Sequence, residues 1–169
     1  MESQKLNVYI VDDNKMMAGS LRKYLQTRFG EKVGISLYFS GDSCMKMMHE
    51  NVHLVILDYY LNERGKAGRN GVEVLRTIKD KFPNTEVIML TSNEDVAVAI
   101  EAMKVGATDY IVKGENSWKK LQQLIERNVT QPIRSLVAEF GVPKFMGIFV
   151  LTFFVMGAMV IWALRLTNS

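Results

Sequence analysis

The sequence predicts an α/β fold in which a doubly wound, five-stranded parallel sheet is followed by a single C-terminal transmembrane helix. Two observations predict the sheet. Short apolar runs alternate with helix-like stretches over the first 129 residues, and four of these runs end in an acidic, hydroxyl or basic side chain. A third observation predicts the membrane helix, because residues 145–164 contain no charged side chain.

The first half of the soluble region predicts three strands and two helices. Residues 6–11 end in a continuous apolar run, as expected for a strand that is buried on both faces. Residues 16–29 repeat apolar side chains at helical spacing, and residues 33–39 have the composition of a second strand. Residues 40–50 begin with a serine that suits a helix N-cap, and residues 54–58 form the third strand.

The second half repeats this alternation after a long polar loop. A helix over residues 71–82 is stopped by a proline, and residues 86–91 read as the fourth strand. A helix over residues 95–105 is closed by a glycine, residues 109–112 give the fifth strand, and residues 118–128 give the last helix. Strand–helix units of this kind imply a parallel sheet that is covered by helices on both faces.

The C-terminal region predicts a membrane anchor. A helix of twenty residues at about 1.5 Å per residue matches a hydrocarbon core of roughly 30 Å. We therefore divide the chain into a soluble domain (1–129), a linker (130–143), a transmembrane helix (144–165) and a short tail (166–169). Cationic residues are more frequent before the span than after it, so we expect a single-pass protein of the cell inner membrane whose soluble domain faces the cytoplasm. The alternative is a buried core helix.

The overall composition narrows the class of partner. The chain has 21 Lys and Arg against 18 Asp and Glu, a nearly even balance without a nucleic-acid-binding signature, so we expect no nucleic acid partner. Cys44 is the single cysteine, which excludes an internal disulfide and fits a reducing compartment.

Polar residues at the ends of the predicted strands form a candidate site. Asp12 and Asp13 follow the first strand, Asp58 follows the third, and Thr91 and Lys113 end the fourth and fifth. The carboxyl ends of parallel strands share one edge, and ligands bind there at the switch point between strands 1 and 3. Carboxylate oxygens suit Mg²⁺, which reduces the repulsion between a carboxylate nucleophile and a phosphoryl group. The site is therefore predicted to accept a phosphoryl group.

Each of these residues also has an ordinary structural explanation. Asp12 fits the N-cap of a helix, Thr91 a hydroxyl at the end of a strand, and Lys113 a solvated surface cation.

Over residues 6 to about 128 the chain resembles the receiver domain of two-component response regulators, with a flavodoxin-like sheet of strand order 2-1-3-4-5. The resemblance rests on the acidic pair after the first strand, Asp58, Thr91 with Ser92, Lys113, and their order. It implies the following roles: phosphoacceptor Asp58; Mg²⁺ ligands Asp12, Asp13, Asp58 and the backbone carbonyl of Tyr60; phosphoryl-binding residues Thr91 and Lys113; switch residues Thr91 and Tyr110.

Three positions depart from the family pattern. Gly114 follows the lysine, where the family usually has a cis proline, so we expect this loop to take a trans path. The loop after Asp58 is longer than usual and lacks the common proline. Tyr60 is bulky, and we expect its side chain to shield the acyl phosphate from water.

The resemblance implies a phosphoacceptor domain, not an enzyme with a separate substrate, and the apolar segment predicts that this domain is tethered to a membrane. Its phosphoryl donor would be a sensor histidine kinase or a histidine phosphotransfer protein, and its output a contact with a protein effector near the lipid bilayer. One alternative is a membrane-anchored adaptor with a receiver fold that works without phosphorylation. Another is a phosphatase of the haloacid dehalogenase type, although that chemistry needs an acid at the position of Tyr60.

Overall fold

The computed structural model describes residues 5–61 and 70–129. The five strands form one parallel sheet of order β2-β1-β3-β4-β5. Their bounds are β1 (Leu6–Val11), β2 (Val33–Tyr38), β3 (Leu54–Leu57), β4 (Glu86–Thr91) and β5 (Asp109–Val112). The predicted doubly wound sheet and its strand order are confirmed.

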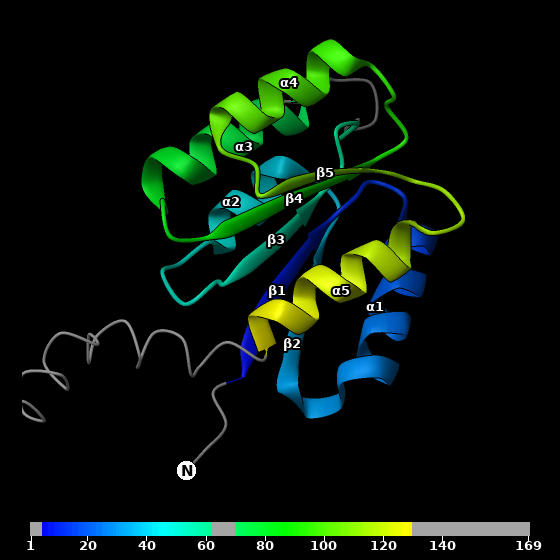
Figure 1. Cartoon of the computed structure of the whole chain (residues 1–169). Helices are drawn as coiled ribbons and strands as arrows, with labels where there is room; N and C mark the ends of the chain where they lie inside the picture. Colours follow the sequence, from blue (N-terminus) through cyan, green and yellow to red (C-terminus); the bar gives the residue numbers. More distant parts are fainter. Residues whose placement is uncertain (1–4, 62–69, 130–169) are drawn as a thin grey trace, which may run out of the picture. The chain divides into compact units, whose positions relative to one another are not determined.

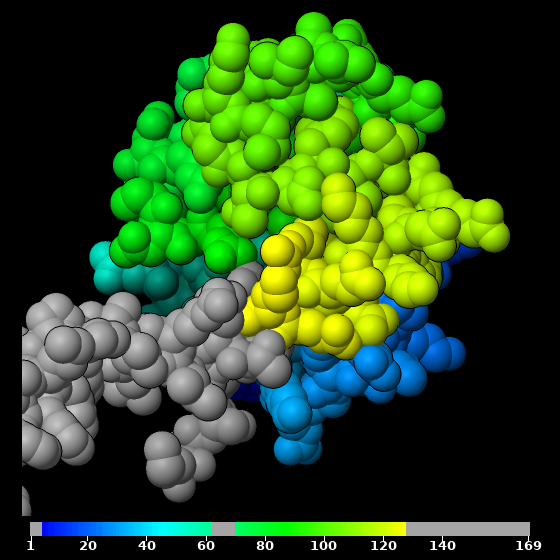
Figure 2. All heavy atoms as spheres, in the orientation of Figure 1, coloured from blue at the N-terminus to red at the C-terminus, as the bar shows by residue number. Residues whose placement is uncertain are grey.

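The helices cover both faces of this sheet, with α1 and α5 on one face and α2, α3 and α4 on the other (Figure 1). Their bounds are α1 (Lys15–Phe29), α2 (Gly41–Met47), α3 (Gly71–Lys81), α4 (Val96–Val105) and α5 (Ser117–Val129). A short 3-10 helix, η1 (Gly30–Lys32), follows α1. Figure 2 shows α5, in yellow, directly beside the blue atoms of the α1 region on one face of the molecule.

The start of α2 follows from a capping interaction that is encoded in the sequence, whereas its end depends on a tertiary contact. Ser40 accepts a hydrogen bond from the backbone N–H of Ser43, as expected for the N-cap of α2. This helix ends at Met47, before the predicted residue 50, and the Tyr9 hydroxyl donates to the Met47 carbonyl over 2.9 Å. A tertiary hydrogen bond therefore satisfies the end of α2 earlier than the local sequence suggests.

The core lies between the sheet and the helices. Strand β3 is buried along its whole length, and the central residues of β1 and β4 are buried as well. Burial of each large aliphatic side chain contributes roughly 1.5–3 kcal/mol. A rigid sheet therefore supports the loops at its carboxyl edge.

The predicted membrane anchor cannot be located in this structure. The linker (130–143), the transmembrane helix (144–165) and the tail (166–169) lie outside the described residues. Within residues 5–61 and 70–129, every helix is too short or too polar to cross a bilayer. The chain divides into two units, Met1–Glu126 and Arg127–Ser169, and the first contains the sheet.

Candidate functional site

Asp12 and Asp13 leave the carboxyl end of β1 at the switch point of the sheet. The backbone N–H of Asp12 donates to the Tyr38 carbonyl over 3.0 Å, which extends the β1–β2 ladder to the site. The Asp12 side chain is 7% exposed, and its Oδ1 accepts a hydrogen bond from the backbone N–H of Asn14. Asn14 itself is the N-cap of α1, so the capping explanation for Asp12 is wrong.

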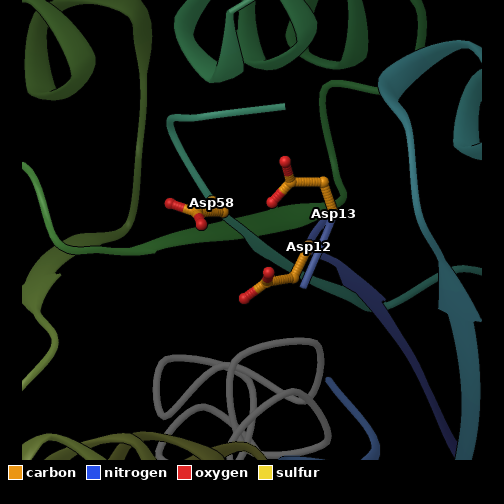
Figure 3. A group of neighbouring side chains, drawn as sticks. All are labelled: Asp12, Asp13 and Asp58. Carbon is orange, nitrogen blue, oxygen red and sulfur yellow. The ribbon is translucent and has the colours of Figure 1, made fainter. Parts of the chain in front are cut away.

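Asp58 directly follows β3, the strand that pairs with β1. Its backbone N–H donates to the Val11 carbonyl over 2.9 Å, and its side chain is 6% exposed. Oxygen atoms of Asp12, Asp13 and Asp58 all lie within 4.8 Å of one another. Figure 3 shows the three carboxylates gathered at one edge of the sheet. The structure thus brings the predicted acidic residues into one small cluster.

Lys113 joins this cluster from the end of β5. Its Nζ donates to Asp58 Oδ2 over 2.7 Å and to Asp12 Oδ2 over 2.8 Å. The side chain is 14% exposed, so the explanation as a solvated surface cation is wrong. The backbone N–H of Lys113 donates to the Thr91 carbonyl, which fixes the start of this loop. The described residues contain no cis peptide bond, which confirms the trans path at Gly114.

The charges in this cluster are not balanced. Burial alone would lower the pKa of the Lys113 ammonium, but its hydrogen bonds to Asp12 and Asp58 outweigh burial and raise that pKa. Burial also raises the pKa of the Asp12 carboxyl, and the hydrogen bond from Lys113 only partly opposes this shift. One ammonium is therefore shared between two buried carboxylates, with the half-buried Asp13 beside them.

This imbalance makes the cluster suitable for a divalent cation. Mg²⁺ prefers hard oxygen ligands and usually binds through one or two carboxylates together with water. Asp13 faces the two buried carboxylates and accepts no hydrogen bond from another described side chain. Tyr60 lies next to the cluster, with its backbone nitrogen 3.4 Å from Asp58 Oδ1. The residues fit Mg²⁺, and the role of the Tyr60 carbonyl stays a prediction.

Thr91 and Tyr110 are connected through one residue, Asn93. The fully buried Thr91 accepts a hydrogen bond at Oγ1 from the backbone N–H of Asn93, over 3.2 Å. The Tyr110 hydroxyl donates to the backbone carbonyl of the same Asn93, over 2.9 Å. Any displacement of Thr91 can therefore reach Tyr110 through a single peptide segment.

Tyrosine side chains and a glycine shape the surroundings of Asp58. The rings of Tyr59 and Tyr60 meet edge to face with centroids 4.9 Å apart, and Tyr60 is 44% exposed. Burial raises the pKa of Tyr110 to about 12, with smaller contributions from Tyr60 and Tyr59. Gly71 returns to this segment after the long loop, and its N–H donates to the Tyr59 carbonyl over 2.8 Å.

Sequence reasoning missed Asn93 and Gly71. Asn93 comes two residues after Thr91 and accepts from the backbone N–H of Asp95, an Asx turn that leads into α4. Gly71 begins α3, and a Cβ there would overlap the Asp58 carbonyl oxygen and lie 2.8 Å from the Tyr59 Cα. The sequence shows a glycine at the end of the loop, but it does not show that the backbone of Asp58 and Tyr59 lies against this glycine.

One protein family matches the sheet and its helices along their length. The model of the response regulator receiver domain matches residues 8–126. The transcriptional regulatory protein ZraR of Salmonella typhimurium is 28% identical over 123 residues, which cover 73% of this chain and 26% of ZraR. ResD of Bacillus subtilis, also a transcriptional regulatory protein, is 31% identical over 113 residues, which cover 66% of this chain and 43% of ResD.

Solved structures show the same likeness. The BeF3-activated receiver domain of DrrB, a Thermotoga maritima protein, has a TM-score of 0.62 and 26% sequence identity. The match covers 73% of this chain and 96% of that domain. The chain spans less than half the length of ZraR and ResD, so the likeness covers one domain of those regulators.

Proposed function

The chain belongs to the response regulator receiver domain family, and we propose that it accepts a phosphoryl group on Asp58 and is tethered to a membrane. Receiver domains are phosphoacceptor signalling domains and bind Mg²⁺ at an acidic pocket. The observation that carries the proposal is the position of Lys113 Nζ between Asp12 and Asp58 at the carboxyl edge of the sheet.

Asp58 is the nucleophile in this proposal. One of its carboxylate oxygens attacks the phosphorus atom of a phosphohistidine, and the bond from phosphorus to the imidazole nitrogen breaks. The electron pair stays with the imidazole, which takes up a proton. Lys113, 2.7 Å from Asp58 Oδ2, reduces the negative charge that the incoming phosphoryl group meets and then binds one of its oxygens.

The remaining residues hold the metal ion and the new phosphoryl group. Asp12, Asp13, Asp58 and the backbone carbonyl of Tyr60 would hold Mg²⁺, which would supply positive charge next to the phosphoryl oxygens. The Thr91 hydroxyl binds another phosphoryl oxygen. Its oxygen accepts a hydrogen bond from the Asn93 N–H, so its O–H is free to donate to the phosphoryl group, and a shift of Thr91 toward that group reaches Tyr110 through the Asn93 carbonyl.

The donor and the output are also part of the proposal. A sensor histidine kinase or histidine phosphotransfer protein donates the phosphoryl group, and a protein effector near the bilayer reads the change at Thr91 and Tyr110. The apolar segment at 144–165 holds the receiver domain on the cytoplasmic side of the inner membrane. A membrane anchor raises the effective concentration of membrane partners without any new contact. We also propose that the chain has no nucleic acid partner. The relatives ZraR and ResD do not support this part of the proposal, because both are transcriptional regulators.

Phosphorylation is tested on the full chain in detergent micelles. The protein is incubated with Mg²⁺ and a small-molecule phosphodonor, and its intact mass is measured. We expect one added phosphoryl group on the wild type and on Asp80→Asn, an exposed residue of α3, but none on Asp58→Asn. An unlabelled wild type would instead support the adaptor that works without phosphorylation.

A further inference from the structure

The receiver domain has a strongly uneven distribution of charge. Residues 1–126 contain 17 Lys and Arg and 17 Asp and Glu, so the net charge is zero. The segments 15–32 and 117–126, which cover one face of the sheet, contain seven cations and two acids, a net charge of +5. The rest of the domain therefore carries −5, and a neutral composition conceals a basic layer.

The cations of this layer all lie on the surface. Five come from α1 and η1, and all five are exposed: Lys15, Arg22, Lys23, Arg28 and Lys32. The other two, Lys119 and Lys120, are exposed on α5. We call these seven side chains the basic face.

Contacts between the helices make this layer one continuous surface. The Tyr24 hydroxyl donates to Gln122 over 2.6 Å, and its ring lies 5.2 Å from the Trp118 ring. Arg28 forms an ion pair with Glu126 over 3.2 Å. Figure 2 shows the atoms of α5 and of the α1 region side by side, without an intervening element.

Among the described residues, most of the cations of the basic face have no acidic partner. Arg28 pairs with Glu126, and Lys120 pairs with Asp109. Arg22, Lys23, Lys32 and Lys119 form no ion pair with another described residue. Surface pairs of this kind are weak, so even the paired cations can exchange their partners for another anion.

We propose that the basic face docks on the anionic lipid headgroups of the membrane that holds the chain. This inference rests on the proposed membrane anchor. Helix α5 leads directly into the linker. The 14 residues of this linker (130–143) span at most about 50 Å when fully extended. The anchor therefore keeps the basic face near the bilayer surface, where each Lys or Arg is attracted to anionic lipid.

The tether also selects lipid over other polyanions. A linker of this length gives the headgroups a high and permanent effective concentration, which a freely diffusing protein or nucleic acid lacks. The carboxyl edge of the sheet, which holds Asp58, lies at the opposite end of α5 from the exit to the linker (Figure 1).

The test measures which lysines the membrane protects. The full chain is reconstituted into neutral phosphatidylcholine vesicles or into vesicles with added phosphatidylglycerol, and exposed amines are labelled with a membrane-impermeant reagent. Labelling of Lys23, Lys32 and Lys119 should fall by about threefold or more in the anionic vesicles at low salt. Protection should disappear at about 1 M salt, where the Debye length is about 3 Å.

Internal controls come from the opposite layer of the domain. Lys81 on α3 and Lys104 on α4 are exposed, and their labelling should be equal in the two kinds of vesicle. The double variant Arg22→Gln, Lys23→Gln should lose much of the protection at Lys119. The matched double variant Lys81→Gln, Lys104→Gln should retain this protection.

The outcomes separate this inference from the anchor on which it rests. Protein that fails to float with neutral vesicles contradicts the membrane anchor and, with it, the inference. If the protein floats with both kinds of vesicle, and Lys23, Lys32 and Lys119 are labelled to the same extent in neutral and anionic vesicles, the docking inference is wrong but the membrane anchor stands. Stronger protection by duplex DNA than by anionic vesicles at equal phosphate concentration also overturns the choice of lipid.

Discussion

The substitution Gly71→Ala should both destabilise the domain and displace the backbone of Asp58 and Tyr59. A Cβ at this position would overlap the backbone carbonyl oxygen of Asp58 and lie 2.8 Å from the Tyr59 Cα. Both neighbours are main-chain atoms next to a buried strand, so they cannot rotate away as a side chain would. Either the start of α3 or the segment after β3 must move.

The expected loss is about 2–4 kcal/mol in the free energy of unfolding. Overpacking of a buried site costs about 1–3 kcal/mol. The hydrogen bond from the Gly71 N–H to the Tyr59 carbonyl, 2.8 Å long, would stretch or break as the backbone moves, which costs about 1 kcal/mol more. Urea unfolding of the full chain in micelles, followed by circular dichroism, measures the difference between the variant and the wild type.

The same substitution at Gly19 is the matched control and should act in the opposite direction. Gly19 lies within α1, and a Cβ there meets no atom within 4 Å. Alanine should therefore stabilise the helix by about 0.5–1 kcal/mol. Phosphorylation by a small-molecule donor should slow in Gly71→Ala and stay unchanged in Gly19→Ala. Equal stability of Gly71→Ala and the wild type would refute the assigned close contact.

Other positions give further predictions. Lys113→Met leaves two buried carboxylates without their shared cation, so the free energy of unfolding in EDTA should fall by about 3 kcal/mol or more, whereas exposed Lys81→Met should change it by less than about 0.5 kcal/mol. Equal losses would contradict the buried pairing. Tyr60→Ala should shorten the lifetime of the acyl phosphate, measured as dephosphorylation by intact mass, and an unchanged lifetime would exclude shielding by the half-exposed ring. Burial raises the pKa of Cys44 to about 12 and keeps the thiol protonated and covered, so a thiol reagent at about pH 8.5 should label the native chain far more slowly than the chain in urea. Comparable rates would show that the core around Cys44 opens readily.

Local sequence signals were sufficient for the sheet and for most helix limits. The strands at 86–91 and 109–112 have the predicted bounds, because each is a short apolar run between clear turn residues. Gly106 adopts a left-handed conformation with φ 113° and ends α4, as a C-terminal glycine predicts. Helix α2 was predicted too long, because the contact that satisfies its last carbonyl comes from Tyr9 in a distant strand.

The site was predictable in its members but not in its connections. One general rule, that the carboxyl ends of parallel strands share an edge, predicts that Asp12, Asp13 and Asp58 lie close together, as they do. The bridge from Lys113 to two carboxylates depends on the path of the loop at Gly114, which spacing in the sequence does not define. The basic face was missed for a similar reason, since a balanced count of charges contains no information about which helices share a layer.

The connection between Thr91 and Tyr110 has an unusual consequence for mutational studies. Its two hydrogen bonds use the backbone N–H and the backbone carbonyl of Asn93, and neither uses the side chain. Alanine at this position would therefore retain the connection and affect only the turn to Asp95. Proline, which has no N–H, would remove the bond to Thr91. An alanine scan would consequently pass over the residue whose backbone joins the two side chains.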